Sequence, residues 1–123
     1  MKFKGQHILS TKQFDRKSLL GLFKEAKKME KLFDGRSDLL KGKIMASLFF
    51  EASTRTRFSF EIAMLKLGGK VVSNFDMQLT SAIKKMETLE DTGKVVSQMV
   101  EVIVARHPDV GAVAKIAHGS DVP

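Results

Sequence analysis

The sequence of 123 residues contains no cysteine, so it offers neither a disulfide framework nor a thiolate site for a metal. No apolar stretch approaches the roughly 18 residues that a membrane-spanning helix needs. Residues 1–6 lack the apolar core of a secretory signal peptide. Together these absences predict a cytoplasmic protein with no membrane partner.

Tryptophan and tyrosine are also absent, although the chain carries a net charge of +7. Residues 12–43 hold ten Lys or Arg and five Asp or Glu, which leaves +5 in this stretch. A basic patch can mark a nucleic-acid interface, but here the basic residues mix with acidic ones along one expected helix. We therefore interpret the charge as a solvated helix face and expect no nucleic-acid partner.

The rest of the composition is typical of a single globular domain. Hydrophobic residues make up 43% of the chain and charged residues 28%. A chain of this length can bury one substantial core but not two. We therefore expect residues 1–123 to form one domain.

The apolar pattern predicts helices and strands in alternation. Strands are expected over residues 44–50, 71–75 and 101–106, and helices from residue 11 or 15 to 33, over 54–67, from the Thr88–Asp91 capping box to about 99, and over 108–119. The helix over 54–67 has apolar residues on more than one face, which predicts that it is heavily buried. The polar stretch 76–85 is expected to be a loop. Alternation of this kind is typical of an α/β fold with a three-layer arrangement, a parallel sheet flanked by helices.

The turn between the first expected strand and the following helix is polar and cationic. Ser53 and Thr54 supply hydroxyl groups, while Arg55 and Arg57 supply positive charge. The first turn of a helix adds unpaired backbone N–H groups and a partial positive charge. These features predict a site for phosphate or a similar oxyanion. The alternative is that Ser53 or Thr54 is only a helix cap and the arginines are solvated, which two clustered like charges disfavour.

Residues 49–61 read Phe-Phe-Glu-Ala-Ser-Thr-Arg-Thr-Arg-Phe-Ser-Phe-Glu. This segment resembles the carbamoyl-phosphate signature of the aspartate and ornithine carbamoyltransferases. Glu51 and the tripeptide Arg106-His107-Pro108 are similar to the aspartate enzymes, whereas ornithine enzymes usually carry lysine in place of Glu51. The resemblance runs from about residue 40 to residue 123, and it implies transfer of a carbamoyl group from carbamoyl phosphate to L-aspartate in pyrimidine biosynthesis, with no metal and no cofactor.

The resemblance also implies roles for individual residues. Ser53, Thr54, Arg55 and Thr56 would hold the phosphate group, and Thr56 and Arg106 would approach the carbamoyl oxygen. Arg106 ends the third expected strand, and the carboxyl ends of parallel strands share one edge of a sheet, so it can converge with this turn. On the pattern alone, Arg106 could equally be a surface arginine before a turn. The neighbouring histidine has no role in the resemblance and is interpreted as structural.

Residues 80–92 resemble the mobile loop of the same family, in which a serine and a lysine reach into the active site of a neighbouring subunit. Ser81 and Lys85 match those positions, so the resemblance adds them to the candidate carbamoyl-phosphate ligands. The candidate catalytic residues are Arg55, Thr56, Arg106 and Lys85. Without the resemblance, Lys85 would be interpreted as a solvated charge. Met86 stands where the family has glycine, so we expect the loop to take another path. The shared site implies a homo-oligomer, a trimer.

The implied mechanism is attack of the aspartate amino group on the carbamoyl carbon with departure of phosphate, promoted by positioning and by stabilisation of negative charge. The resemblance also leads us to expect that the last strand of the sheet and a second, aspartate-binding domain are missing. L-aspartate would then bind only together with that domain, and this chain alone would be inactive. A non-catalytic anion-binding or interaction module built on the same fold remains an alternative, and an ornithine-type enzyme is a weaker third.

Overall fold

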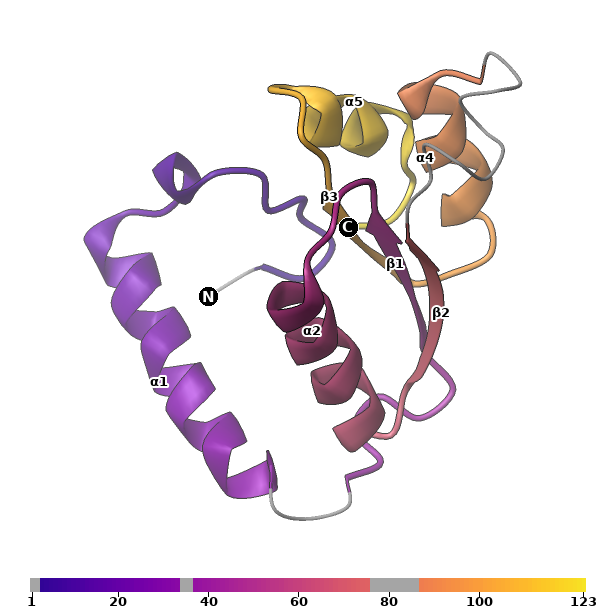
Figure 1. Cartoon of the computed structure of the whole chain (residues 1–123). Coiled ribbons are helices and arrows are strands. Elements are labelled where there is room, and N and C mark those ends of the chain that lie inside the picture. The colour runs from indigo at the N-terminus through magenta and orange to yellow at the C-terminus, as the bar shows by residue number, and fades with distance from the viewer. Residues whose placement is uncertain (1–2, 34–36, 76–86) are drawn as a thin grey trace.

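The computed structural model describes residues 3–33, 37–75 and 87–123. The described helices and strands follow one another along the chain as shown in Figure 1. They are η1 (Thr11–Gln13), α1 (Arg16–Phe33), β1 (Ile44–Phe49), α2 (Thr54–Lys66), β2 (Lys70–Phe75), α4 (Leu89–Ser97), β3 (Val102–Arg106) and α5 (Ala112–Gly119). Within these residues, no helix is both long enough and apolar enough to span a membrane.

The three strands form one parallel sheet in the order β2-β1-β3. Helix α2 lies on one face of this sheet, and α4 and α5 lie on the other (Figure 1). The predicted α/β fold, a parallel sheet flanked by helices, is therefore confirmed. The central strand β1 is buried from Met45 to its end at Phe49, as expected for a strand covered on both faces.

The main core lies between the sheet and the α4–α5 pair. Alternate residues of β1, Ala46 and Leu48, pack there with Phe50, Val100 and Ile116. Helix α4 begins at the predicted capping box, in which the Thr88 hydroxyl accepts from the Asp91 N–H at 3.0 Å. This layer holds the carboxyl end of β3 in a fixed place beside β1.

The first helix begins at the later of its two expected starts, because Asp15 opens α1 by accepting from the Ser18 N–H at 2.7 Å, and residues 11–13 form the separate short helix η1. Two other expectations from the sequence need correction. The last helix begins at Ala112 rather than near residue 108, because Gly111 has a φ of +82° and a left-handed residue cannot continue a right-handed helix.

The expectation that the helix over 54–67 is heavily buried is wrong. Of the residues in α2, only Met64 is fully buried, while Phe58, Ile62 and Leu65 are 45%, 44% and 57% exposed. One side of α2 packs on the sheet, and within the described ranges no further layer covers its apolar residues on the other sides (Figure 1). Helix α1 stands beside α2 without packing closely on the sheet (Figure 1).

Candidate functional site

Strands β1 and β3 end side by side, so the turn after β1 meets the last residue of β3. Phe49 and Arg106 are register partners, and the next residue, Phe50, donates its N–H to the Arg106 carbonyl at 2.9 Å. Helix α2 then begins at Thr54. The sequence therefore places a helix N-terminus and an arginine at the same edge of the sheet, which is where parallel α/β sheets bind ligands.

The guanidinium of Arg106 is the centre of this cluster. Its Nη1 donates to the Ser53 hydroxyl at 3.0 Å and to the Thr56 hydroxyl at 3.4 Å. Its Nε donates to the carboxylate of Glu51. The Arg106 side chain remains 44% exposed, so a ligand from solvent can still reach it.

Ser53 is the N-cap residue of α2, yet its side chain makes no capping hydrogen bond. Its hydroxyl accepts from Arg106 instead. The structure therefore does not support the alternative that Ser53 is only a helix cap. Thr54 is exposed at the first position of the helix. The backbone N–H groups of this first turn have no intrahelical acceptors and point out of the helix end, which favours an anion.

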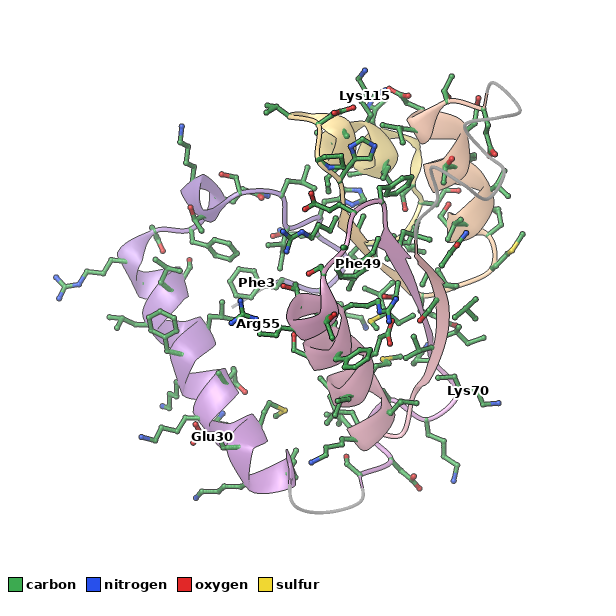
Figure 2. The ribbon with its side chains drawn as sticks, in the orientation of Figure 1. Phe3, Glu30, Phe49, Arg55, Lys70 and Lys115 are labelled. Carbon is green, nitrogen blue, oxygen red and sulfur yellow. The ribbon has the colours of Figure 1, made fainter. Side chains whose placement is uncertain are left out.

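The two arginines of the motif lie apart from Arg106. Arg55 is exposed and extends from α2 towards Phe3, on the side where α1 lies (Figure 2). Arg57 lies with its Nε 3.7 Å from a Glu61 carboxylate oxygen, and Glu61 accepts from the Ser73 hydroxyl at 2.6 Å. Arg57 thus belongs to a link between α2 and β2 rather than to the cluster around Arg106, while Arg55 as a phosphate ligand stays a prediction.

Glu51 is a site residue that the sequence analysis did not identify. Its carboxylate, 34% exposed, forms an ion pair with Arg106. The signal was a lone acidic residue two positions before the cationic turn, which we used only to distinguish the aspartate enzymes from the ornithine enzymes. Ser81, Lys85 and Met86 lie outside the described residues.

A cavity of about 490 Å³ opens beside this cluster. Thr56 and Arg106 contribute polar groups to its lining, while most of its wall is apolar and comes from β3, α5, residues 6–9 and the segment after α5. The candidate anion-binding groups therefore belong to the turn and the helix end, and the cavity adds apolar space next to them. Among the residues that the structure describes, no cluster of three or more His, Cys, Asp or Glu could hold a metal ion.

Fold and candidate site together define a class: a parallel α/β domain in which an arginine, two hydroxyls and a helix N-terminus meet at the ends of β1 and β3. Comparison with known families makes the assignment more specific, because residues 6–123 match the carbamoyl-P binding domain of the aspartate/ornithine carbamoyltransferases. The chain belongs to this family.

Named relatives agree with the aspartate branch. The chain is 44% identical to the chloroplastic aspartate carbamoyltransferase of Arabidopsis thaliana, with 99% of this chain and 32% of that protein covered. It is 45% identical to the aspartate carbamoyltransferase catalytic subunit of Methanococcus vannielii, with 96% and 39% covered. The chain therefore spans 32% and 39% of the length of these two relatives.

Solved structures give the same result. The aspartate transcarbamoylase of Trypanosoma cruzi in complex with carbamoyl phosphate and aspartate superposes with a TM-score of 0.87 at 40% identity, covering 98% of this chain and 37% of that one. The catalytic subunit of the M. jannaschii aspartate transcarbamoylase superposes with a TM-score of 0.88 at 43% identity, covering 95% and 39%. The predicted resemblance to the N-terminal part of aspartate carbamoyltransferases is confirmed.

Proposed function

We propose that this chain is the carbamoyl-phosphate-binding part of an aspartate carbamoyltransferase, the enzyme that transfers the carbamoyl group of carbamoyl phosphate to the amino group of L-aspartate. One observation carries the proposal: the Arg106 guanidinium meets the Ser53 and Thr56 hydroxyls at the N-terminus of α2. A planar cation, two hydroxyls and free helix N–H groups are suited to a phosphate bearing a planar carbonyl.

Each group has a part in the proposed chemistry. The N–H groups of the first turn of α2, with Ser53, Thr54, Arg55, Thr56 and Arg106, hold the phosphate, and Arg55 swings from its exposed position to do so. Thr56 and Arg106 face the carbamoyl oxygen and stabilise the negative charge that develops there when the amine attacks. Ser81 and Lys85, which belong to a neighbouring copy in this proposal, complete the phosphate site.

The proposal extends to the assembly and its surroundings. Residues 1–123 act as one carbamoyl-phosphate-binding domain, L-aspartate binds only when a second domain is present, and the active form is a homo-oligomer, a trimer. Solved structures of the T. cruzi enzyme contain carbamoyl phosphate with aspartate, or aspartate with phosphate, which supports these small-molecule partners. A cytoplasmic location stays a prediction. One relative is named chloroplastic. Fluorescence microscopy of the tagged protein tests the location.

Calorimetric titration of inorganic phosphate into the folded chain tests the site. Arg106→Ala removes a charged hydrogen-bond donor, which is worth about 1.5–3 kcal/mol, so we expect phosphate affinity to fall by about ten- to a hundredfold. Lys70→Ala is the matched control, because Lys70 is an exposed cation at the start of β2, away from the Arg106 turn (Figure 2). Absence of phosphate binding by the parent chain, or an equal loss in both variants, would contradict the proposed site.

A further inference from the structure

The imidazole of His107 connects the two turns that form the site. The ring lies 4.8 Å from the Phe50 ring, centroid to centroid, and the His107 side chain is only 6% exposed. The backbone joins the same two turns, because the Phe50 N–H donates to the Arg106 carbonyl. The residue that follows Arg106 therefore packs on the residue that precedes Glu51.

The second contact of His107 closes its own turn. Its Nδ1 accepts from the Asp109 N–H at 3.0 Å. Since an accepting Nδ1 carries no proton, the hydrogen of the neutral ring is on Nε2. This bond fixes the backbone directly after Arg106, at the point where β3 ends.

We propose that His107 is a positioning residue for the anion site: its buried ring and its Nδ1 bond to Asp109 hold the chain so that Arg106 meets Ser53, Thr56 and Glu51. The inference rests on the proposed function for the role of Arg106, and it adds a residue for which the sequence analysis gave no function. Arg106 is half exposed and long, so its side chain reaches its partners only if its Cα lies at the right distance and direction from them. A fixed backbone on its carboxyl side sets that starting position. His107 itself does not touch the cluster and takes no part in bond making.

Two substitutions separate the ring from the hydrogen bond. His107→Phe keeps an aromatic ring against Phe50 but removes the acceptor for the Asp109 N–H. His107→Asn removes the ring but keeps a side-chain acceptor, and an Asn oxygen commonly accepts from the N–H two residues ahead. If His107→Phe does not fold, His107→Leu replaces it, because it also lacks the acceptor.

The first measurement needs no ligand. In ¹⁵N–¹H spectra of the parent chain, the Arg106 Nε–H donates to Glu51 and should give a resolved, slowly exchanging signal. We expect this signal to move towards that of free arginine and to exchange faster in His107→Phe, and to return largely to its place in His107→Asn. An unchanged Arg106 signal in folded His107→Phe would overturn the proposal.

The second measurement is a double-mutant cycle for phosphate affinity. His107→Phe should weaken phosphate binding by about three- to tenfold in the parent chain, the loss that one neutral hydrogen bond corresponds to. The same change should have no effect on phosphate binding in an Arg106→Ala background, although it lowers the melting temperature in both. An equal affinity loss in both backgrounds would mean a general structural role and overturn the proposal. If the parent chain binds no phosphate, the proposed function fails for the isolated chain, and the Arg106 signal alone decides on His107.

Discussion

Arg106 is held between a carboxylate and two hydroxyls, and these partners have opposite effects on an incoming anion. The hydroxyls of Ser53 and Thr56 accept from Arg106 and leave their own hydrogens for a ligand. The carboxylate of Glu51 orients Arg106 but also cancels part of its charge. In the described chain, the main cation of the candidate site thus forms an ion pair.

Substitution of Glu51 by Gln should strengthen phosphate binding. The amide keeps the size and an acceptor for the Arg106 Nε but loses the negative charge that repels phosphate. Since both side chains are over a third exposed, the effect is limited, up to about fivefold at low salt, and added salt should reduce it. Calorimetry at two salt concentrations measures it, and weaker binding by Glu51→Gln would show that orientation of Arg106 outweighs repulsion.

The contacts of Arg106 could be predicted from the sequence, whereas those of Arg57 could not. The approach of Arg106 to the motif turn could be anticipated from strand ends alone. The separation of Arg57 from the site could not, although Glu61 four residues ahead was a visible helical partner. The third member of that link, Ser73, comes from another element, so no local pattern indicates it.

The helices and strands themselves were predicted better than the exposure of α2 and the start of α5. The three strands, the parallel sheet and the α4 cap follow from apolar periodicity and capping chemistry, which are local. The exposure of α2 depends on what covers it, and the start of α5 depends on the backbone angle of Gly111. Such tertiary properties have no sequence signal of their own.

Helices α4 and α5 pack closely enough that glycine is required between them. A Cβ at Gly93 would lie 2.1 Å from the Ile116 carbonyl oxygen. Alanine has the higher helix propensity, but here it forces the two helices apart, so Gly93→Ala should lower the free energy of unfolding by about 1–3 kcal/mol. Urea unfolding followed by circular dichroism measures this, and equal or greater stability would contradict the packing described.

Asp121 connects the segment after α5 to α4. Hydrogen bonding from Lys94, and then from Gln98, lowers the pKa of Asp121 below its usual value of 3.8. A carboxyl with a lower pKa in the folded state stabilises the fold above its unfolded pKa, and this contribution is lost as the pH falls through the folded pKa.

Replacing Asp121 by Asn should therefore lower the melting temperature slightly at neutral pH, and the difference from the parent chain should shrink once the pH drops below 3.8. The effect is small because both partners are over half exposed. Thermal melts at neutral pH and at a series of acid values give the comparison. A difference that stays constant into acid would show that the charge of Asp121 is not responsible.

At the scale of the whole molecule, the apolar faces of the two long helices lack cover. Phe23 on α1 is 61% exposed and Leu65 on α2 is 57% exposed. Large exposed apolar side chains on both of these helices favour an interaction surface there. We therefore predict that the 123-residue chain self-associates, as a trimer if the contacts proposed for Ser81 and Lys85 form. It would be a dimer if the outer edge of β3, where the Ile103 N–H donates to the Pro123 carbonyl at 2.8 Å, pairs with a second copy instead. Light scattering over a range of concentrations gives the mass, and a monomer throughout would contradict both assemblies.

The chain on its own should not form carbamoyl-aspartate. It spans between 32% and 39% of the named relatives, and the described cation next to the carbamoyl position, Arg106, is already paired with Glu51. Without a site that orients the amine, the positioning effect of about 7–11 kcal/mol is lost. A colorimetric assay of carbamoyl-aspartate checks this, and steady turnover that disappears in Arg106→Ala would show that the chain or a second copy completes the site.

The most direct test of the central claim is to find where the anion binds. Titration of phosphate into ¹⁵N-labelled chain, followed by ¹⁵N–¹H spectra, reports each backbone N–H and the Arg106 Nε–H. The account predicts that the largest changes occur at residues 53–56 and at Arg106, where the start of α2 meets the end of β3. Changes confined to the basic helix α1, or scattered evenly over the surface, would contradict it.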